Sequence, residues 1–204
     1  MENNYDLIPY PDEVKTIFIL ESPHSDELEN KYPVAGQTGK NMSRNILDDD
    51  QIPFGKLLME RDSRIKNYGV FNTCHFPLGK PELLEGRELE IAAIKFVHQT
   101  DDRYDNYRRM SKFLNTIENI DEIINYKSRL SGILINHQSI ETLVICGFIA
   151  QSISIKIYPK FGSPDLPMYN TPGKIENDKG RKIMLHFVNH PSELNGQKWD
   201  YIPK

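Results

Sequence analysis

Four short apolar runs constrain the fold of this 204-residue chain more than any other feature. Each run has the length and composition of a strand that is buried on both faces of a sheet. Each run stops at a turn or a polar residue, and segments with helical spacing separate the runs. This order predicts βαβ units and a parallel sheet sandwiched by helices, which is an α/β fold. The predicted strands are residues 16–20, 68–72, 142–146 and 183–188.

Two segments between the strands lack helical spacing. Residues 21–39 contain two prolines and two glycines and are predicted to form a long loop, a kind of segment that is usually functional in a compact domain. Residues 159–182 are rich in proline, glycine and polar residues and predict a long excursion or a hairpin. Helices are predicted over residues 40–47, 54–61, 83–96, 104–114, 120–126, 130–137 and 148–157.

The composition is that of a soluble globular protein, with 38% hydrophobic and 26% charged residues. The length predicts one domain over residues 1–204. No apolar stretch approaches the roughly 20 residues of a membrane span, and residues 1–6 do not resemble a signal peptide, so we expect a cytoplasmic protein without a membrane partner. The net charge of −4 argues mildly against broad non-specific nucleic-acid binding, although a local basic stripe is enough for a specific contact.

The chain has two cysteines, Cys74 and Cys146, and each follows or ends a strand-like run. Two thiols cannot form a four-cysteine zinc or iron–sulfur site, so we predict buried free thiols. The histidines at 75, 98, 137 and 186 show no metal-ligand spacing. The sequence therefore predicts neither a metal site nor a cofactor.

Two loop motifs follow the first and the last predicted strand. Residues 20–24 read Leu-Glu-Ser-Pro-His, and residues 189–192 read Asn-His-Pro-Ser. In an open parallel sheet, loops at the carboxyl ends of strands line the ligand crevice. Glu21 and His190 are therefore predicted to share one site, where a carboxylate and an imidazole can activate water or stabilise charge.

Each candidate residue also has a structural interpretation. Glu21 is either a site residue or a cap for the following turn, and His24 contacts a ligand or lies in a surface turn. Gly36 belongs to a loop that lacks the spacing of a P-loop. This glycine either allows the backbone to approach a planar ligand or a phosphate, or adopts a positive φ that a tight loop requires. Asn72 reads the edge of a base or caps a turn. Leu194 is a wedge for a nucleic-acid groove or a hydrophobic anchor.

These motifs, in this order, resemble the uracil-DNA glycosylase superfamily, especially its bacterial and archaeal branch. The first motif of that branch reads like G-E-A-P-G and is followed by an acidic stretch and a P-F-V-G-x-x-G loop. The matching segments here are residues 20–24, 25–27 and 33–39, followed by Asn72 for the base-reading asparagine, 144–147 for the turn before a core helix, and 190–192 for the second catalytic motif.

The resemblance implies a three-layer α/β/α domain with a short, mostly parallel four-stranded sheet. It also implies DNA as the partner, and excision of a deaminated base (uracil, hypoxanthine or xanthine) flipped out of DNA during repair. Glu21 would activate water, and His190 would stabilise the negative charge of the leaving base. The implied substrate contacts are Ser22, Pro23, His24, Val34, Gly36, Asn72 and Ser192.

The chain also departs from that branch. Val34 stands where the branch has an aromatic residue that stacks on the base, which leaves Tyr32 or Phe71 as substitutes. The four cluster cysteines are missing, so no iron–sulfur cluster is expected. Two other interpretations stay open: a non-catalytic relative that binds a nucleotide, nucleic acid or protein, and an unrelated small-molecule hydrolase of flavodoxin-like topology. The sequence leaves the oligomeric state undetermined.

Overall fold

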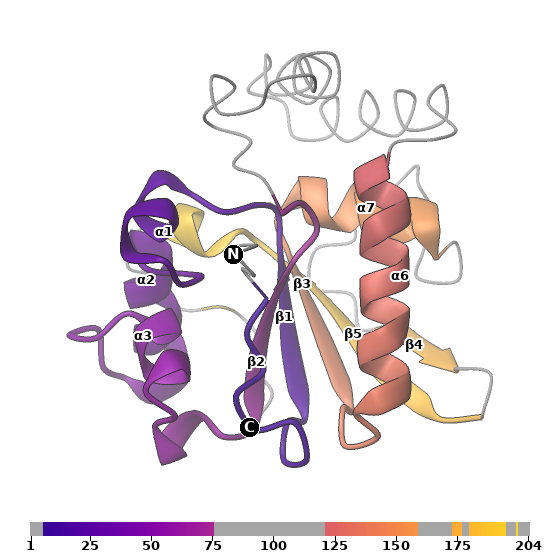
Figure 1. Cartoon of the computed structure of the whole chain (residues 1–204), viewed down its shortest axis with the longest axis horizontal. Coiled ribbons are helices and arrows are strands. Elements are labelled where there is room, and N and C mark those ends of the chain that lie inside the picture. Colours follow the sequence, from indigo (N-terminus) through magenta and orange to yellow (C-terminus); the bar gives the residue numbers. More distant parts are fainter. Residues whose placement is uncertain (1–5, 76–120, 159–172, 177–179, 195–198, 200–204) are drawn as a thin grey trace.

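A parallel sheet is the centre of the fold. The computed structural model describes residues 6–75, 121–158, 173–176, 180–194 and 199, and the statements below concern these residues (Figure 1). Four strands run parallel to one another as predicted, and helices flank them, which confirms the α/β fold. These strands are β1 (Thr16–Leu20), β2 (Tyr68–Asn72), β3 (Thr142–Cys146) and β5 (Lys182–Val188).

The strand order is β2-β1-β3-β5-β4, so β1 and β3 occupy the middle of the sheet. Leu20 pairs with Asn72, and Cys146 pairs with Val188, which brings the carboxyl ends of the parallel strands to one side of the molecule. A fifth strand, β4 (Gly173–Glu176), pairs antiparallel with β5 inside the segment predicted as an excursion or hairpin. This strand was not predicted, because it has one apolar residue, Ile175, and therefore shows neither an alternating nor a continuous apolar pattern.

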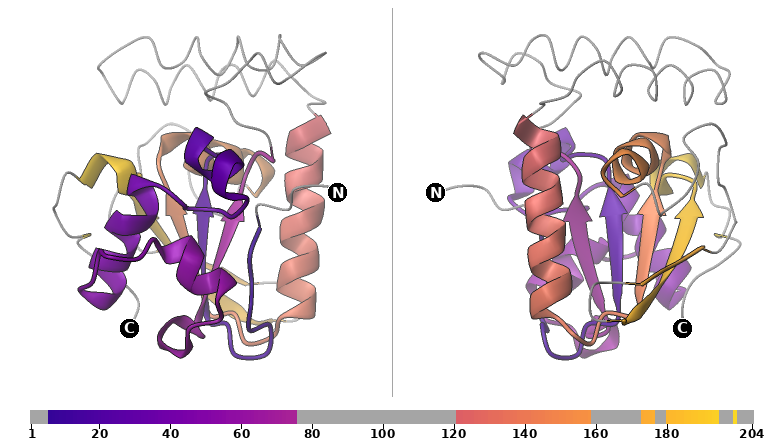
Figure 2. Two further views of the ribbon diagram at one scale, coloured as in Figure 1. Left: turned by 60° about the vertical axis from the view of Figure 1, so that its left-hand side comes forward. Right: turned by 90° about the vertical axis from the view of Figure 1, so that its right-hand side faces the viewer.

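Helices cover both faces of the sheet (Figure 2). Ile17 and Ile19 of β1 belong to one core cluster, whereas Phe18 and Leu20 belong to the other. This alternation is expected of a strand that is buried on both faces. One layer consists of α1 (Ser25–Asn30), α2 (Gln37–Leu47) and α3 (Phe54–Met59). The layer on the other face consists of α6 (Asp121–Asn136) and α7 (Phe148–Ile157). Two short 3-10 helices are η1 (Ser63–Ile65) and η4 (Pro191–Leu194).

Two predictions of local structure need correction. The long loop predicted over residues 21–39 contains α1, which carries two acidic residues in its first turn, where the helix dipole favours them. The two helices predicted over 120–126 and 130–137 are one continuous helix, α6. The helices predicted over 83–96 and 104–114 lie outside the described residues.

Arg129 on α6 joins the N-terminal segment to the end of β2. Its Nη1 lies 2.6 Å from Asp6 Oδ2, and His75 Nε2 lies 3.1 Å from the same oxygen. Its Nη2 donates to the carbonyl groups of Asn72 and Thr73 at 2.9 and 3.0 Å. The side chains of Asp6 and Arg129 are only 10% and 15% exposed, so this ion pair is largely withdrawn from solvent.

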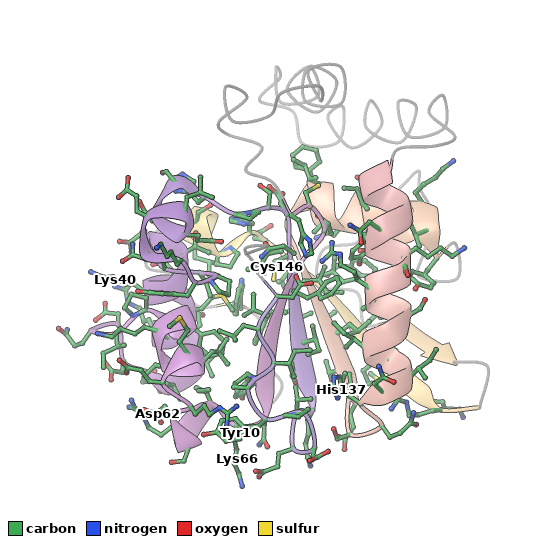
Figure 3. The ribbon with its side chains drawn as sticks, viewed as in Figure 1. Tyr10, Lys40, Asp62, Lys66, His137 and Cys146 are labelled. Carbon is green, nitrogen blue, oxygen red and sulfur yellow. The ribbon has the colours of Figure 1, made fainter. Side chains whose placement is uncertain are left out.

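Both cysteines are buried free thiols, as predicted. Cys146 ends β3 (Figure 3), and burial raises the pKa of its thiol well above the ordinary value, which makes it unreactive. Among the helices that the structure describes, none is both long enough and apolar enough to cross a membrane.

Candidate functional site

A cavity of about 380 Å³ lies at the carboxyl ends of β1 and β5. The start of α7 and the first turns of α1 and α2 complete its wall. This is where the crevice rule for parallel sheets places a ligand, and the volume is that of a small-molecule site. The lining residues are Leu20, Glu21, Ser22, Pro23, His24, Asp26, Glu27, Gly36, Gln37, Thr38, Phe148, His190 and Ser192.

Glu21 and His190 meet in this cavity although about 170 positions separate them in the sequence. Seven of the nine residues that the sequence predicts for the site line it. The other two, Val34 and Asn72, lie elsewhere and are fully buried. The lining members of the predicted set are Glu21, Ser22, Pro23, His24, Gly36, His190 and Ser192.

Val34 and Asn72 are held in place by other contacts. Val34 packs in the core cluster beneath α2 and α3 with a φ of 48°, a left-handed conformation that is strained for a β-branched residue. The backbone of Asn72 takes part in the Arg129 contacts: its N–H donates to Asp6 Oδ1 at 2.9 Å, and its carbonyl accepts from the guanidinium. Their expected substrate contacts therefore do not coincide with the cavity wall.

Glu21 both lines the cavity and caps a helix. Its Oε1 accepts a hydrogen bond of 3.3 Å from the backbone N–H of Ile149, in the first turn of α7. The positive end of the helix dipole favours a carboxylate at this point. Gly147 makes the approach feasible, because it has a φ of 82° and a Cβ atom there would lie 2.5 Å from Oε1. The sequence suggested a cap for the turn after β1, whereas the structure places the Glu21 carboxylate at the start of α7, in the wall of the cavity.

Gly36 makes room for a neighbouring carboxylate. Its φ of −90° is not in the left-handed region, so the predicted need for a positive φ is wrong. A Cβ atom at this position would lie 1.9 Å from Asp26 Oδ2. The missing side chain thus lets the first turn of α1 approach the start of α2 at the rim of the cavity.

His190 is oriented by the residue two positions further on. Its Nδ1 lies 2.7 Å from Ser192 Oγ and accepts a 3.3 Å hydrogen bond from the Ser192 backbone N–H. Because Nδ1 accepts, the proton of the neutral ring is on Nε2, which becomes a donor. Burial, with a contribution from His24, lowers the pKa of His190 to about 4, so the imidazole is neutral at pH 7.

We predict that the imidazole of His190 titrates with a pKa of about 4, compared with about 6.5 for an ordinary histidine. As pH falls from about 6.5 to about 4, His190 becomes protonated in the unfolded chain but stays neutral in the folded chain. His190 therefore lowers the stability of the fold as pH falls through this range. Ring-proton NMR shifts followed from pH 8 to pH 3 measure the midpoint, and a midpoint near 6.5 would contradict the prediction.

Glu27 is a lining residue that the sequence analysis left outside the site. Its side chain is 4% exposed, and burial is the largest cause that raises its pKa to about 8. Backbone hydrogen bonds from Val34 and His24 act in the opposite direction, and the charge of Asp26 adds to the rise. The N-cap residue, His24, is not the serine or threonine of a capping box, so no sequence signal marked Glu27.

We predict that Glu27→Gln stabilises the fold at high pH. The native carboxyl keeps its proton up to about pH 8, whereas the unfolded one loses it near 4.5, so wild-type stability falls as pH rises through this range. The variant does not lose a proton, so between pH 5 and pH 9 the wild type is expected to lose about 4 kcal/mol of unfolding free energy that the variant keeps. Urea unfolding of the wild type and the variant at pH 5 and at pH 9 measures the two free energies of unfolding. If stability depends on pH equally in both proteins, the raised pKa of Glu27 is ruled out.

Phe148 supplies the aromatic ring that the sequence analysis sought at other positions. It opens α7 directly after Gly147 and lines the cavity. Phe71, one of the expected substitutes, is fully buried against Tyr126 and does not line the cavity. The sequence could have indicated Phe148 as a site residue, because it lies just after the strand predicted over residues 142–146, as Glu21 lies just after the strand predicted over residues 16–20.

A hydrogen-bonded chain links the cavity rim to the His190 loop. Gln37 Nε2 donates to Asn41 Oδ1 at 2.9 Å, and Asn41 Nδ2 donates to the Pro191 carbonyl at 2.8 Å. Leu194 at the end of this loop is 6% exposed and packs in the core, as expected of a hydrophobic anchor. The position of His190 therefore depends on α2 as well as on β5.

The cavity is acidic and holds no lysine or arginine among its described lining residues. Lys40 lies on the exposed side of α2 (Figure 3). The described residues contain no group of three or more histidine, cysteine or acidic side chains arranged to hold a metal ion. The chain matches no protein-family model and no curated protein.

Proposed function

We propose that this protein hydrolyses N-glycosidic bonds and releases a deaminated base from DNA. The observation that carries the proposal is the presence of Glu21 and a neutral His190 in one cavity of about 380 Å³. The order of the sequence motifs, which resembles the uracil-DNA glycosylase superfamily, supports it. A base must leave the helical stack to reach such a cavity, as in other enzymes that act on bases.

The two residues suit the two halves of the reaction. A water oxygen attacks the anomeric carbon of the sugar, and the Glu21 carboxylate takes up a proton from that water. The bond from the sugar to the base nitrogen breaks, and its electron pair stays on the base. The Nε2–H of His190 donates to the base oxygen on which negative charge develops, and a neutral imidazole performs this role without a prior proton uptake.

Some of the other lining residues would position the base or approach the DNA. Phe148 offers a ring face for stacking, which is worth about 1–3 kcal/mol per base in single-strand recognition. Ser22, Pro23 and His24 form one wall next to Glu21. Ser192 orients His190 and lies at the exposed edge, where the loop would approach the DNA backbone.

The test is release of base from labelled oligonucleotides that carry uracil, hypoxanthine or xanthine, in single- and double-stranded form. We expect release of at least one base by the wild type and its loss in Glu21→Gln and His190→Ala, with circular dichroism spectra unchanged. Equal release by the wild type and both variants, or no release from any substrate by the folded wild type, would overturn the proposal.

A second candidate is a protein that binds a base or nucleotide without turnover. The engagement of Glu21 Oε1 by the Ile149 N–H favours it, because the carboxylate already has a structural partner. Asn72, the expected base-reading residue, does not line the cavity, and this favours the binding function as well. Binding of the same oligonucleotides without release, retained in Glu21→Gln, would identify this function.

A further inference from the structure

Two buried asparagines lie one helical turn apart on α2, at depths where apolar side chains are usual. Asn41 is 3% exposed and Asn45 is 7% exposed. Their spacing of four residues puts them on one face of the helix, and α2 packs against η4, the short helix that follows His190 (Figure 2). A buried amide costs free energy unless its donors and acceptors are paired, so the partners of these two side chains indicate their role.

Asn41 holds the carbonyl group that directly follows His190. Its Nδ2 donates a hydrogen bond of 2.8 Å to the carbonyl of Pro191. Because a carbonyl can only accept, this contact determines which end of the amide faces the loop. Oδ1 is therefore left as an acceptor, and it accepts from Gln37 Nε2 at 2.9 Å. Asn41 thus connects Gln37, a lining residue of the cavity, to the loop that carries the imidazole.

Asn45 acts on the other side of the same loop, through Trp199. Its Oδ1 accepts from the backbone N–H of Trp199 at 2.7 Å, and the indole N–H of Trp199 donates to the carbonyl of Asn189 at 3.1 Å. The indole also stacks on Phe18 of β1, with ring centres 5.6 Å apart. The amide nitrogen of Asn45 donates to the backbone carbonyl of Asn41 at 2.7 Å, which links the two asparagines.

We propose that Asn41 and Asn45 are positioning residues, which fix the carbonyl groups on both sides of His190 and so hold its imidazole at the cavity with Nε2–H as the donor. The pair is called the asparagine clamp below. The clamp rests on hydrogen bonds of 2.7–3.1 Å and on the burial of both amides. That the imidazole donates to a base rests on the proposed function.

The clamp acts on the proton of His190 through η4. The backbone N–H of Ser192 donates to Nδ1, and Ser192 follows Pro191, the first residue of η4 and the one that Asn41 holds. When Pro191 is released, the Ser192 N–H no longer stays against Nδ1. The neutral ring can then carry its proton on either nitrogen, and it presents Nε2–H to the cavity for only part of the time.

The experiment follows the two ring nitrogens of His190 by ¹⁵N NMR at pH 7, where the imidazole is neutral. In the wild type we expect well-separated signals for a protonated Nε2 and an unprotonated Nδ1. Asn41→Leu has nearly the same size but no donor, and its two signals should approach each other as the tautomers mix. Ser43→Ala is the matched control, because it removes a buried hydrogen bond of the same helix that goes to the Ile52 carbonyl; its signals should equal those of the wild type.

Asn41→Asp tests the clamp by means of its own proton. The ionised carboxylate places a second acceptor against the Pro191 carbonyl, so the His190 signals should move as in Asn41→Leu. The protonated carboxyl group can donate as asparagine does, so the wild-type signals should return. Burial raises the pKa of such a carboxyl group, and about pH 5 and about pH 8 are suitable for the comparison, because His190 itself stays neutral at both.

Two results overturn the clamp: wild-type signals in Asn41→Leu, or an equal change in Ser43→Ala. If Asn41→Leu does not fold, Asn41→Asp decides, and identical signals at pH 5 and pH 8 overturn the clamp. Single-turnover kinetics separate the clamp from the proposed function, since Asn41→Leu is expected to lower kcat for base release about 10²-fold, as for a small displacement of a catalytic group. Base release by the wild type with unmoved signals in Asn41→Leu overturns the clamp alone, whereas moved signals without release from any oligonucleotide overturn the glycosylase alone.

Discussion

Glu21→Gln is expected to lower kcat for base release by a factor of about 10²–10⁴, the range for removing a positioned general base. Glutamine has the size of glutamate but cannot take up the proton of the attacking water. Its side-chain carbonyl can still accept from the Ile149 N–H, so the cap of α7 is retained. Single-turnover kinetics on an oligonucleotide that the wild type cleaves measure the effect, separated from product release.

Asp26→Asn is the matched control for this substitution. Asp26 lines the same cavity from α1 and also carries a carboxylate, but the proposed mechanism gives it no role. Its exchange removes the same charge and is expected to change kcat by less than about threefold, given the screening of a half-exposed group. An equal loss in both variants would show that Glu21 acts through the charge of the cavity and not as a base.

Arg129→Ala is expected to lower the free energy of unfolding by about 3–5 kcal/mol, because it removes the guanidinium from a largely buried ion pair, although Asp6 keeps its contacts with His75 and the Asn72 N–H. Asp6 would lose its 2.6 Å contact, and the carbonyls at the end of β2 would lose their donors. The guanidinium also lies 4.6 Å from the centre of the Phe71 ring, so its removal takes away a packing contact. Urea unfolding at pH 7 measures the loss.

Lys15→Ala provides the comparison for an exposed pair. Lys15 and Glu141 are 3.8 Å apart, and their side chains are 55% and 68% exposed. An exposed pair of this kind contributes at most about 1 kcal/mol. If Arg129→Ala cost no more than Lys15→Ala, the contacts around Asp6 would not hold the N-terminal segment to the sheet.

The parallel strands could be predicted from the sequence because each is buried on both faces and is therefore a continuous apolar run. All five residues of β1 and of β3 are buried, as expected of strands that are covered on both faces. Helix α1 could not be predicted in the same way. Its one apolar residue is Leu28 and it begins two residues after Pro23, so the close approach of its first turn to the start of α2 determines it instead.

The convergence of Glu21 and His190 could be predicted because each directly follows a parallel strand, and the topology brings those strand ends together. Glu27 and Phe148 were missed for a different reason. Glu27 reaches the cavity from a helix that the sequence did not indicate, and Phe148 was taken as part of a core helix. Val34 was expected in the site from its place in a motif, but its strained backbone directs it into the core.

The hydrogen bond between Glu21 and Ile149 provides a reporter of the state of the site. The Ile149 amide proton is protected only while the Glu21 carboxylate faces α7. When that carboxylate turns towards a water or a ligand, the first turn of the helix loses an acceptor and its amide exchanges faster with solvent. Hydrogen exchange at this one amide therefore reads out, without any substrate label, how often Glu21 leaves the helix for the cavity.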